Sequence, residues 1–338
     1  MALALTTAPL SLKLKHPFHI ARGVESVAKS VLFELRDDEH EGLGEATPIA
    51  RYGESVDSVI AFFREHPLTL DNPFRLEELL RSDIPPAARA GLDIALHDLI
   101  GKRLGMSLCA MLGLDPAETP RTSFTIGIAD PETTLRKLAE VASHPILKVK
   151  LGIGSDAEQI ETINAIRSRY TGTIRIDANE AWDVPRAIAI LRELERYDIE
   201  FCEQPIAAGN PQGLRAIRES ANIAVVTDED SRTASDLPGL YGCVDGVNIK
   251  LAKCGGIRAA LAMIHTARAL GFKIMLGCMV ESSIAATAAA HLSPLVDWAD
   301  LDGPFLTTSD PFVGVTYRDG KLILPDAPGI GVRRAAAA

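Results

Sequence analysis

The sequence of 338 residues lacks any apolar run of the roughly 18 to 20 residues that a membrane-spanning helix needs. The stretch from Met1 to Leu12 is apolar but has neither a basic beginning nor an A-x-A cleavage site, so we expect no signal peptide. The five cysteines are scattered and form no C-x-x-C pair, which is typical of reduced thiols. We therefore expect a cytoplasmic protein with no membrane partner.

An excess of positive charge is also missing. Lys and Arg number 35 against 45 Asp and Glu, and no basic cluster is present that a nucleic-acid backbone would require. We therefore expect no nucleic-acid partner. Hydrophobic residues make up 47% and charged residues 24%, which is the balance of a globular protein and excludes wholesale disorder. At roughly 150 residues per domain, the length predicts about two domains.

The first 120 residues predict an α+β unit. Alternating polarity predicts strands at 12–15 and 31–35, and the polar turn at 37–42 would return the chain into a third strand. From residue 55 to residue 114 the pattern becomes helical, and the clearest helix begins at Pro85-Pro86. Strands followed by helices are typical of an α+β domain.

After Pro120, short apolar runs alternate with amphipathic helical stretches. Eight runs are present, at 122–128, 146–150, 173–177, 200–203, 224–228, 247–250, 273–277 and 298–301. The second to seventh runs end about every 25 residues, which is the period of the βα unit in a TIM-type barrel. The eighth run has no full helix after it, and the D-G turn signal at 317–321 predicts a hairpin.

The predicted fold class is therefore α/β. We expect a modified TIM barrel, (β/α)7β, over residues 121–315 as the catalytic domain. An N-terminal α+β capping domain over residues 1–120 would be completed by residues 316–334, to which the chain returns after leaving the barrel.

Six of the eight predicted barrel strands end in charged residues. A single charge at a strand end is ordinary, but catalytic groups in a TIM barrel lie at these ends, so the repetition indicates a site. In chain order the charged residues are Lys148 and Lys150, Asp177, Glu203, Asp228, Lys250, and Asp300 with Asp302.

Asp177, Glu203 and Asp228 lie on three neighbouring predicted strands, so their carboxylates are expected to converge. Three close anions repel one another unless a cation lies between them. Oxygen ligands without His or Cys suit Mg²⁺, and we expect one Mg²⁺ per subunit on these three residues. A carboxylate cluster neutralised only by lysine and arginine is the alternative.

Lys150 and Lys250 would flank this metal ion from opposite sides of the barrel mouth. A lysine with the ordinary pKa of ~10.4 is a poor base at neutral pH. Positive charge from Lys148 and the divalent ion is expected to lower that pKa and to make a neutral amine available. Two bases with a metal ion between them suit proton removal next to a carboxylate: the metal holds the enediolate, and the second lysine returns a proton to the other face.

This arrangement resembles the enolase superfamily, in its muconate-cycloisomerase-like subgroup, over nearly the whole chain. The motifs that carry the resemblance are Lys148-Val-Lys150, Asp177-Ala-Asn179, Glu203-Gln204-Pro205, Asn248-Ile-Lys250-Leu and Gly255-Gly256. Two further motifs, Arg51-Tyr-Gly-Glu54-Ser and Asp300-Leu-Asp302-Gly-Pro, are more similar to the dipeptide epimerases. The sequence departs from the commoner A-D-E-S pattern at Thr227-Asp228-Glu229-Asp230, which keeps the metal ligand and changes its neighbour.

The resemblance implies an isomerase that inverts the α-carbon of the C-terminal residue of a dipeptide by 1,1-proton transfer. The expected substrate is L-Ala-D/L-Glu from cell-wall peptide turnover. Lys150 and Lys250 would be the catalytic bases, with Mg²⁺ as the cofactor.

Further residues receive expected roles from the same resemblance. Lys148 would bind the substrate carboxylate, while Asp300 and Asp302 would hold the α-ammonium of the dipeptide. Arg22, in an N-terminal loop that closes over the barrel mouth, would meet an acidic side chain. Two residues would support the site, namely Asn179 and Glu229, the latter by pairing with the lysine on the sixth strand.

Several alternatives remain at this stage. An o-succinylbenzoate synthase or N-acylamino-acid racemase would use the same bases and metal, but Asp300 and Asp302 would then have no ammonium to hold. A Schiff-base aldolase would leave the three carboxylates without a role, and a non-catalytic barrel would not need both lysines. The segment Glu281-Ser282-Ser283 either lines the site or caps the following helix. A homo-oligomer is compatible with the sequence.

Overall fold

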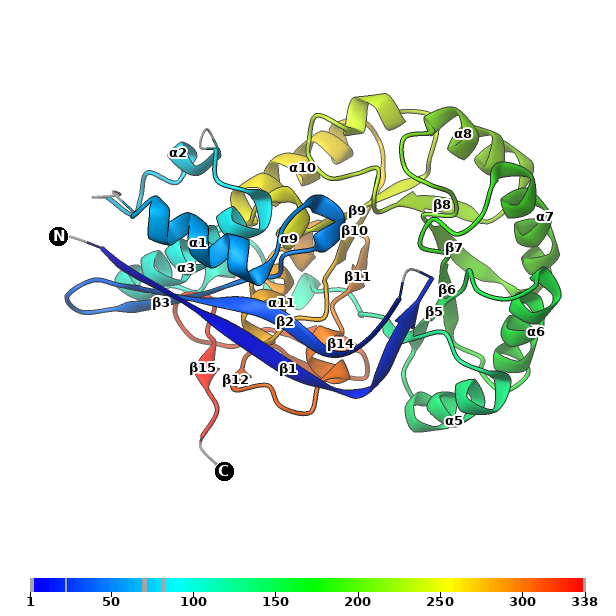
Figure 1. Ribbon diagram of the computed structural model, residues 1–338, viewed down its shortest axis with the longest axis horizontal. Helices are drawn as coiled ribbons and strands as arrows, with labels where there is room; N and C mark the ends of the chain where they lie inside the picture. Colours follow the sequence, from blue (N-terminus) through cyan, green and yellow to red (C-terminus); the bar gives the residue numbers. More distant parts are fainter. Residues whose placement is uncertain (1–2, 22, 69–71, 81–82, 337–338) are drawn as a thin grey trace.

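The N-terminal region of the computed structural model is an antiparallel sheet packed against helices; the structure describes residues 3–21, 23–68, 72–80 and 83–336. The strands β1 (Ala4–Ile20), β2 (Gly23–Arg36) and β3 (Glu41–Ala46) follow one another in the sheet. The helices described in this region are α1 (Val56–Glu65), α2 (Glu77–Leu80), α3 (Pro86–Leu104) and α4 (Leu108–Met111). Figure 1 shows this region beside the ring of barrel strands.

The predicted long helix is confirmed as α3. Pro86 lies in its first turn, where no hydrogen bond is lost, and Gly105 ends it in the left-handed conformation at φ 65°. β3 lies so close to α3 that a Cβ at Gly44 would be 2.0 Å from the carbonyl oxygen of Gly91. Only glycine allows this approach, which places β3 and Glu45 next to the barrel.

The β1–β2 hairpin extends from this sheet over the barrel mouth (Figure 1). Its pairing register shifts between Lys13 and Phe18, which bends the hairpin. Near its tip, the carbonyl oxygen of His19 accepts a hydrogen bond from the N–H of Ile128 at 2.9 Å. The hairpin therefore contacts the loop that follows the first barrel strand.

A parallel eight-stranded sheet forms the barrel, and its strands follow one another in chain order from β4 to β11. The strands are β4 (Phe124–Ile126), β5 (Ile146–Lys150), β6 (Thr173–Asp177), β7 (Ile199–Glu203), β8 (Ala224–Thr227), β9 (Gly246–Lys250), β10 (Lys273–Gly277) and β11 (Trp298–Asp300). A parallel bridge between Thr122 and Ala299 joins the two ends of the sheet. The predicted barrel is confirmed, and each strand boundary lies within two residues of the prediction.

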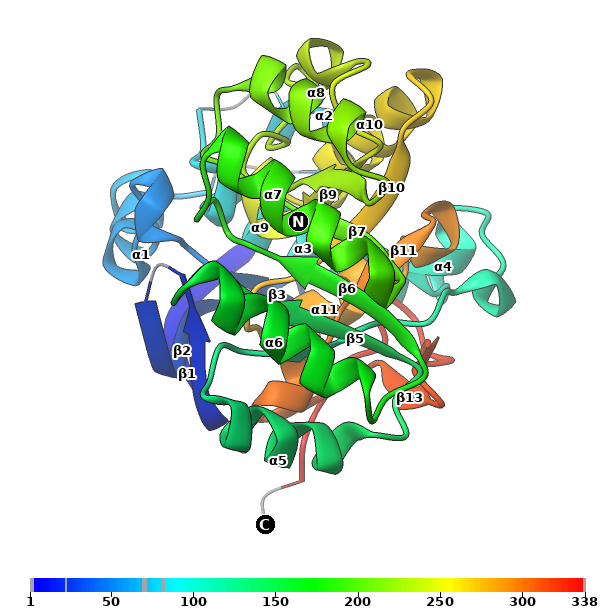
Figure 2. The same cartoon turned by 90° about the vertical axis from the view of Figure 1, so that its right-hand side faces the viewer.

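Helices cover the outside of the barrel, as Figure 2 shows for α5 to α8. They are α5 (Pro131–Val141), α6 (Asp156–Arg167), α7 (Val184–Leu194), α8 (Pro211–Ser220), α9 (Leu251–Cys254), α10 (Ile257–Ala269) and α11 (Ser283–Ala290). One connection differs from the expected repeat: between β8 and β9, within the described residues, the chain forms only the 3₁₀ helix η4 (Leu237–Leu240). This is the shortest interval between predicted strand ends, and Pro238 lies within it. No helix of the described residues is long and apolar enough to cross a membrane.

The chain after β11 returns to the N-terminal region. β13 (Thr316–Arg318) and β14 (Lys321–Ile323) form the predicted hairpin, with Asp319 and Gly320 both at positive φ. Further on, the N–H of Ile330 donates to Asp98 of α3 at 2.9 Å. β12 (Phe312–Val313) pairs with β15 (Arg333–Arg334), and Arg334 forms an ion pair with Glu34 of β2. The division into domains at residues 120 and 315 stays a prediction.

Two layers of side chains fill the barrel interior. Phe201, Val226 and Met275 form a small apolar cluster inside the sheet. Because alternate residues of a strand share one face, Glu203 lies above Phe201 on β7, towards the carboxyl end of the strand. Beneath the charged residues that end its strands, the barrel therefore contains this apolar cluster, with the buried Arg175 of β6 5.2 Å above the ring of Phe201.

Candidate active site

Lys148 of β5 lies at the centre of the charged layer and is 1% exposed. Its Nζ is 2.6 Å from Oδ2 of Asp300 and 3.4 Å from Oδ2 of Asp177, and it forms an ion pair with Glu203. Burial alone would lower the pKa of Lys148, but Asp300, Glu203 and Asp177 outweigh it and raise that pKa well above its usual value. Lys148 is therefore a fixed ammonium that joins carboxylates of three strands.

Lys150, two residues further along β5, points to the same face and pairs with Asp177. Its Nζ is 2.5 Å from Oδ2 of Asp177. The other oxygen of that carboxylate accepts the N–H of Asn179 at 2.8 Å. Burial would raise the pKa of Asp177, but Lys150 and Lys148 outweigh it and hold the pKa below its usual value. Asp177 is therefore an ionised carboxylate with each oxygen occupied.

Lys250 at the end of β9 pairs with the carboxylate at the end of β8. Its Nζ lies 2.9 Å from Oδ2 of Asp228, and the ammonium of Lys253 contacts Oδ1 of the same carboxylate. Burial would lower the pKa of Lys250, but Asp228 and Glu203 outweigh it and raise that pKa above its usual value. Lys148 acts to lower the pKa of Lys250, as expected of a neighbouring positive charge, but the two carboxylates have the larger effect.

Glu203 of β7 lies between these two pairs and is fully buried. Its Oε1 accepts from Nδ2 of Asn248 at 2.7 Å. Burial and the nearby Asp177 raise the pKa of Glu203, while Lys148 opposes the shift. A protein carboxylate in this position gains from a further cation, because its own burial and its neighbours disfavour its negative charge.

The three carboxylates predicted as metal ligands are thus brought together in one buried cluster. Lysine ammonium groups lie among them, and no three His, Cys, Asp or Glu side chains of the described residues form a ready-made metal site. The donor set nevertheless fits Mg²⁺, because it offers carboxylate oxygens of Asp177, Glu203 and Asp228 without a His or Cys ligand. The burial of Glu203 beside Asp177 supports the same fit, since a divalent cation would offset the charge that burial disfavours.

The loops that follow β6 and β7 have strained backbone. Asn179 (φ 45°), Glu180 (φ 69°) and Gln204 (φ 35°) lie in the left-handed region, which costs roughly 1–2 kcal/mol for a residue with a side chain. Gln204 has a clear compensating role, because its Oε1 accepts the N–H groups of Asp228 and Glu229 at 3.0 and 3.1 Å. The strained loop after β7 thereby fixes the loop after β8.

Asp300 and Asp302 lie at the end of β11 and have different partners. Asp300 accepts from the hydroxyl of Ser123 at 2.5 Å and pairs with Lys148, which outweighs the effect of burial and lowers its pKa to about 2. Asp302 accepts the N–H of Thr125 at 2.6 Å. Burial and the charge of Asp300 raise the pKa of Asp302 to about 6. The pair is buried at the barrel mouth, and its role towards an ammonium stays a prediction.

The N-terminal region contributes a second wall to the site. Arg51 of the 3₁₀ helix η1 (Ala50–Tyr52) forms an ion pair with Glu180 at 2.5 Å, and Arg232 lies 4.3 Å above the ring of Tyr52. Burial, then Asp228 and Glu229, raise the pKa of Tyr52 to about 12, so its hydroxyl stays protonated near these acids. The predicted substrate contact Arg22 lies outside the described residues.

Glu281 is buried in the loop after β10. Its Oε1 accepts the N–H of Met279 at 3.0 Å, and burial with the charge of Glu45 raises its pKa to about 8. The cap of α11 is instead Ser282, whose hydroxyl accepts the N–H of Ile284 at 3.1 Å. Within the segment Glu281-Ser282-Ser283, the capping role is therefore filled by Ser282.

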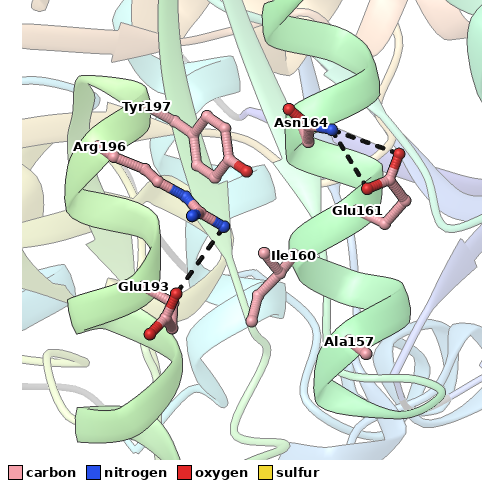
Figure 3. Close-up of a pocket in the computed structure, with 7 residues that line it drawn as sticks. All are labelled: Ala157, Ile160, Glu161, Asn164, Glu193, Arg196 and Tyr197. Carbon is pink, nitrogen blue, oxygen red and sulfur yellow. Dashed lines mark hydrogen bonds and ion pairs between the residues drawn. The ribbon is translucent and has the colours of Figure 1, made fainter.

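Two cavities lie near or on the barrel. One of about 580 Å³ extends from Lys150 past His19 of the hairpin tip to α6. Another, of about 610 Å³, is a groove on the outer surface between α6 and α7 (Figure 3). It is lined by Ile160, Glu193, Arg196 and Tyr197 among others and contains no predicted site residue. The first cavity is the one that reaches the charged cluster.

Sequence reasoning missed several residues of the cluster. Lys253, Ser123 and Thr125 contact predicted site residues but were not assigned to the site. The available signal for Lys253 was limited to its position three residues after Lys250, because the single turn that carries it is too short to show periodicity. Ser123 and Thr125 show no such signal, since small polar residues are common in strands.

Comparisons with known proteins agree with this arrangement. The family model "Mandelate racemase / muconate lactonizing enzyme, N-terminal domain" matches residues 3–113, and the model "Enolase C-terminal domain-like" matches residues 132–337. The chain is 39% identical to the L-Ala-D/L-Glu epimerase of Bacteroides thetaiotaomicron, over 98% of this chain and 88% of that protein.

Two solved structures are also similar. The dipeptide epimerase of Enterococcus faecalis complexed with Mg and L-Leu-L-Tyr has a TM-score of 0.90 at 33% identity, covering 97% of this chain and 98% of that one. The N-succinyl Arg/Lys racemase of Bacillus cereus has a TM-score of 0.92 at 28% identity, covering 99% and 96%. Both a free-dipeptide enzyme and an N-acyl enzyme therefore share this fold.

Proposed function

Since the chain belongs to the mandelate racemase / muconate lactonizing enzyme family, we propose that it is a Mg²⁺-dependent dipeptide epimerase. It inverts the α-carbon of the C-terminal residue, and its substrate is L-Ala-D/L-Glu or a similar dipeptide. The relative from Bacteroides thetaiotaomicron and the structure complexed with Mg and a dipeptide support this assignment.

The observation that carries the proposal is the placement of the two lysines. Lys150 ends β5 and Lys250 ends β9, and in a closed sheet of eight strands β5 and β9 are four strands apart in either direction. Their amines therefore face each other across the mouth. Inversion of a carbon centre needs a base on one face and an acid on the other, and two opposed lysines meet this requirement.

Asp177, Glu203 and Asp228 would hold the Mg²⁺. When bound, the ion would supply positive charge next to the substrate carboxylate, which favours loss of the neighbouring α-proton. The charge balance of the cluster supports this role. A lysine that acts as a base must first lose its proton, and Asp177 or Asp228 would then lose its counter-charge. Lys148 stays an ammonium throughout and is placed to neutralise the carboxylate of the substrate.

Asp300 and Asp302 would bind the α-ammonium of the dipeptide. Both carboxylates are buried at the mouth, and burial beside Asp300 disfavours the negative charge of Asp302, so a substrate cation would be stabilising there. This is the feature that favours a free dipeptide over the alternative, an o-succinylbenzoate synthase or N-acylamino-acid racemase. Arg22 would meet the acidic side chain of the C-terminal residue.

The finer features of the assignment belong to the same proposal. The enzyme would act in the cytoplasm on peptides released by cell-wall turnover, with no nucleic acid or membrane as partner. The five free cysteines support a reducing compartment. The predicted division into a capping domain and a barrel is supported by the position of the charged cluster. All of its predicted metal ligands and bases lie at the ends of barrel strands, from β5 to β9.

Incubation of a dipeptide library in D₂O tests the proposal directly. We expect deuterium at the α-carbon of the C-terminal residue, inversion of that centre, and loss of both when Mg²⁺ is chelated. Free L-Ala-L-Glu should react at least ~10-fold faster than its N-acetyl form, measured as kcat/KM. Equal rates on the two would favour the N-acylamino-acid racemase, and full activity in excess chelator would exclude the metal site.

A further inference from the structure

Lys253 is a buried lysine close to the proposed metal site that the mechanism above does not use. It is 2% exposed and lies in the single turn of α9, three residues after Lys250. Its ammonium contacts Oδ1 of Asp228, whereas Lys250 contacts Oδ2 of the same carboxylate. The two oxygens of Asp228 therefore have different lysines as partners.

The remaining contacts of Lys253 are with backbone carbonyl oxygens. Its Nζ is 2.5 Å from the carbonyl oxygen of Asp228, 3.3 Å from that of Asn248 and 3.4 Å from that of Ser231. A carbonyl oxygen accepts hydrogen bonds and donates none, so this surrounding suits an ammonium with its three donors. Because these oxygens belong to the backbone of β9 and of the loop after β8, Lys253 is held in one place.

The turn that carries Lys253 is itself fixed by the N-terminal region. A Cβ at Gly255 would lie 2.3 Å from the side chain of Arg89, and a Cβ at Gly256 would lie 2.4 Å from that of Asp93. Both glycines are at positive φ, which L side chains rarely adopt. In addition, the N–H of Ile257 donates to Asp93 at 2.5 Å. α3 therefore holds the end of the turn against the barrel.

We propose that Lys253 is a positioning residue that holds Asp228 through Oδ1, so that only Oδ2 is presented to the metal ion and to Lys250. The inference rests on the proposed function, in which Asp228 is a metal ligand. It assigns different roles to two neighbouring lysines: Lys250 moves a proton, and Lys253 fixes the ligand. A free Asp228 would rotate about χ2 and exchange its oxygens, which would weaken metal binding.

The test compares Lys253→Met and Lys253→Gln with the wild-type enzyme. Met removes the ammonium at similar volume, and Gln keeps a hydrogen-bond donor without the charge. We expect Lys253→Met to weaken Mg²⁺ binding at least 10-fold, measured by isothermal titration calorimetry well below the melting temperature. Lys253→Gln should weaken binding by less. A proton-exchange readout follows from the geometry: in D₂O, the epimer whose α-proton Lys250 removes should lose exchange more than the epimer served by Lys150. Lys250→Ala identifies which epimer is which.

Lys102→Met is the matched control. Lys102 pairs at 2.6 Å with the buried Asp98, which lies one turn earlier in α3, and neither residue contacts the predicted site residues that the structure describes. Its loss should lower the melting temperature and leave the Mg²⁺ dissociation constant within twofold of wild type. A Mg²⁺ affinity within twofold of wild type in Lys253→Met, or an equal loss of exchange for both epimers, would overturn the inference. If neither Lys253 variant folds while Lys102→Met does, Lys253 serves folding and the inference is likewise overturned. A wild-type enzyme that binds no Mg²⁺ would instead contradict the proposed function.

Discussion

The two halves of the site hold their lysines and acids in different ways. In the β5 half, defined by Lys148, Lys150 and Asp177, both lysines lie on one strand and their positions follow from its alternation. In the β9 half, defined by Lys250, Lys253 and Asp228, the second lysine lies on the helical turn after the strand. A strand places both amines inside the barrel, whereas the turn directs Lys253 to backbone carbonyl oxygens.

This difference has a chemical consequence. In the β5 half, Lys148 contacts three carboxylates, so it joins β5 to β6, β7 and β11. In the β9 half, both lysines contact the same carboxylate. Under the proposed function, the β5 half would neutralise the carboxylate of the substrate through Lys148, and the β9 half would fix one metal ligand, Asp228.

The largest expected effect comes from removing either base. Lys150→Ala and Lys250→Ala should each lower the rate of epimerisation by ~10²–10⁴-fold, because each lysine serves one face of the α-carbon. If the halves act independently, each variant still exchanges the α-proton of one epimer with D₂O. The epimer that still exchanges should be the opposite one in the two variants. NMR of L-Ala-L-Glu and L-Ala-D-Glu in D₂O measures this. Wild-type epimerisation by either variant would show that its missing lysine is not a base.

The second largest effect is expected from loss of the metal ion, which should affect both halves of the site. Chelation should abolish turnover, and added Mg²⁺ should restore it. Asp177→Asn and Asp228→Asn should each lower kcat/KM by ~10²-fold or more, because an amide oxygen is a weaker ligand for Mg²⁺ than a carboxylate. Circular dichroism should show that both variants keep the barrel. If only one of them weakens Mg²⁺ binding, the two acids are not equivalent ligands.

Much of this comparison could be predicted from the sequence, and the missing part has a physical cause. β5, β6 and β10 begin and end at the predicted residues, because buried parallel strands are short apolar runs bounded by charge. The three acids of the cluster and Lys150 and Lys250 were therefore found from strand ends. Lys253 was missed because the strand pattern ends at Lys250 and a four-residue helix is too short to show periodicity.

The contacts between barrel strands were not predicted from the sequence. That Asp300 pairs with Lys148 and Asp302 with the N–H of Thr125 depends on the closure of the barrel between β11 and β4, which one sequence does not specify. The raised pKa of Lys250 was also not predicted, because it depends on how closely Asp228 and Glu203 approach the amine. Distances of this kind decide the direction of a shift.

A moderate effect should come from the ammonium pocket beside the β5 half. N-acetylation of L-Ala-L-Glu should lower kcat/KM at least ~10-fold. Asp302→Asn should reduce this difference in kcat/KM between the free and the N-acetyl dipeptide. The pKa of about 6 for Asp302 adds a pH dependence: below pH 6 its carboxyl becomes neutral and attracts an ammonium less. KM for the free dipeptide should therefore rise as the pH falls below 6, and KM for the N-acetyl form should not. A parallel rise for both substrates would contradict this role.

The smallest expected effect concerns the stability of the loop after β10, whose Glu281 faces Glu45 of the N-terminal region. The pKa of Glu281 is about 8 in the folded protein and 4.5 in the ordinary reference state. Between these values the folded protein binds more protons than the unfolded chain, so the free energy of unfolding falls as the pH rises from about 4.5 to 8. Glu281→Gln keeps the hydrogen-bond geometry without this titration. It should raise the melting temperature at pH 8 by a few degrees and leave it nearly unchanged at pH 5. The exposed Glu118→Gln is the control and should change neither value. Equal shifts at both pH values would show that Glu281 is not protonated near neutrality, and that its side chain acts on stability through contacts alone.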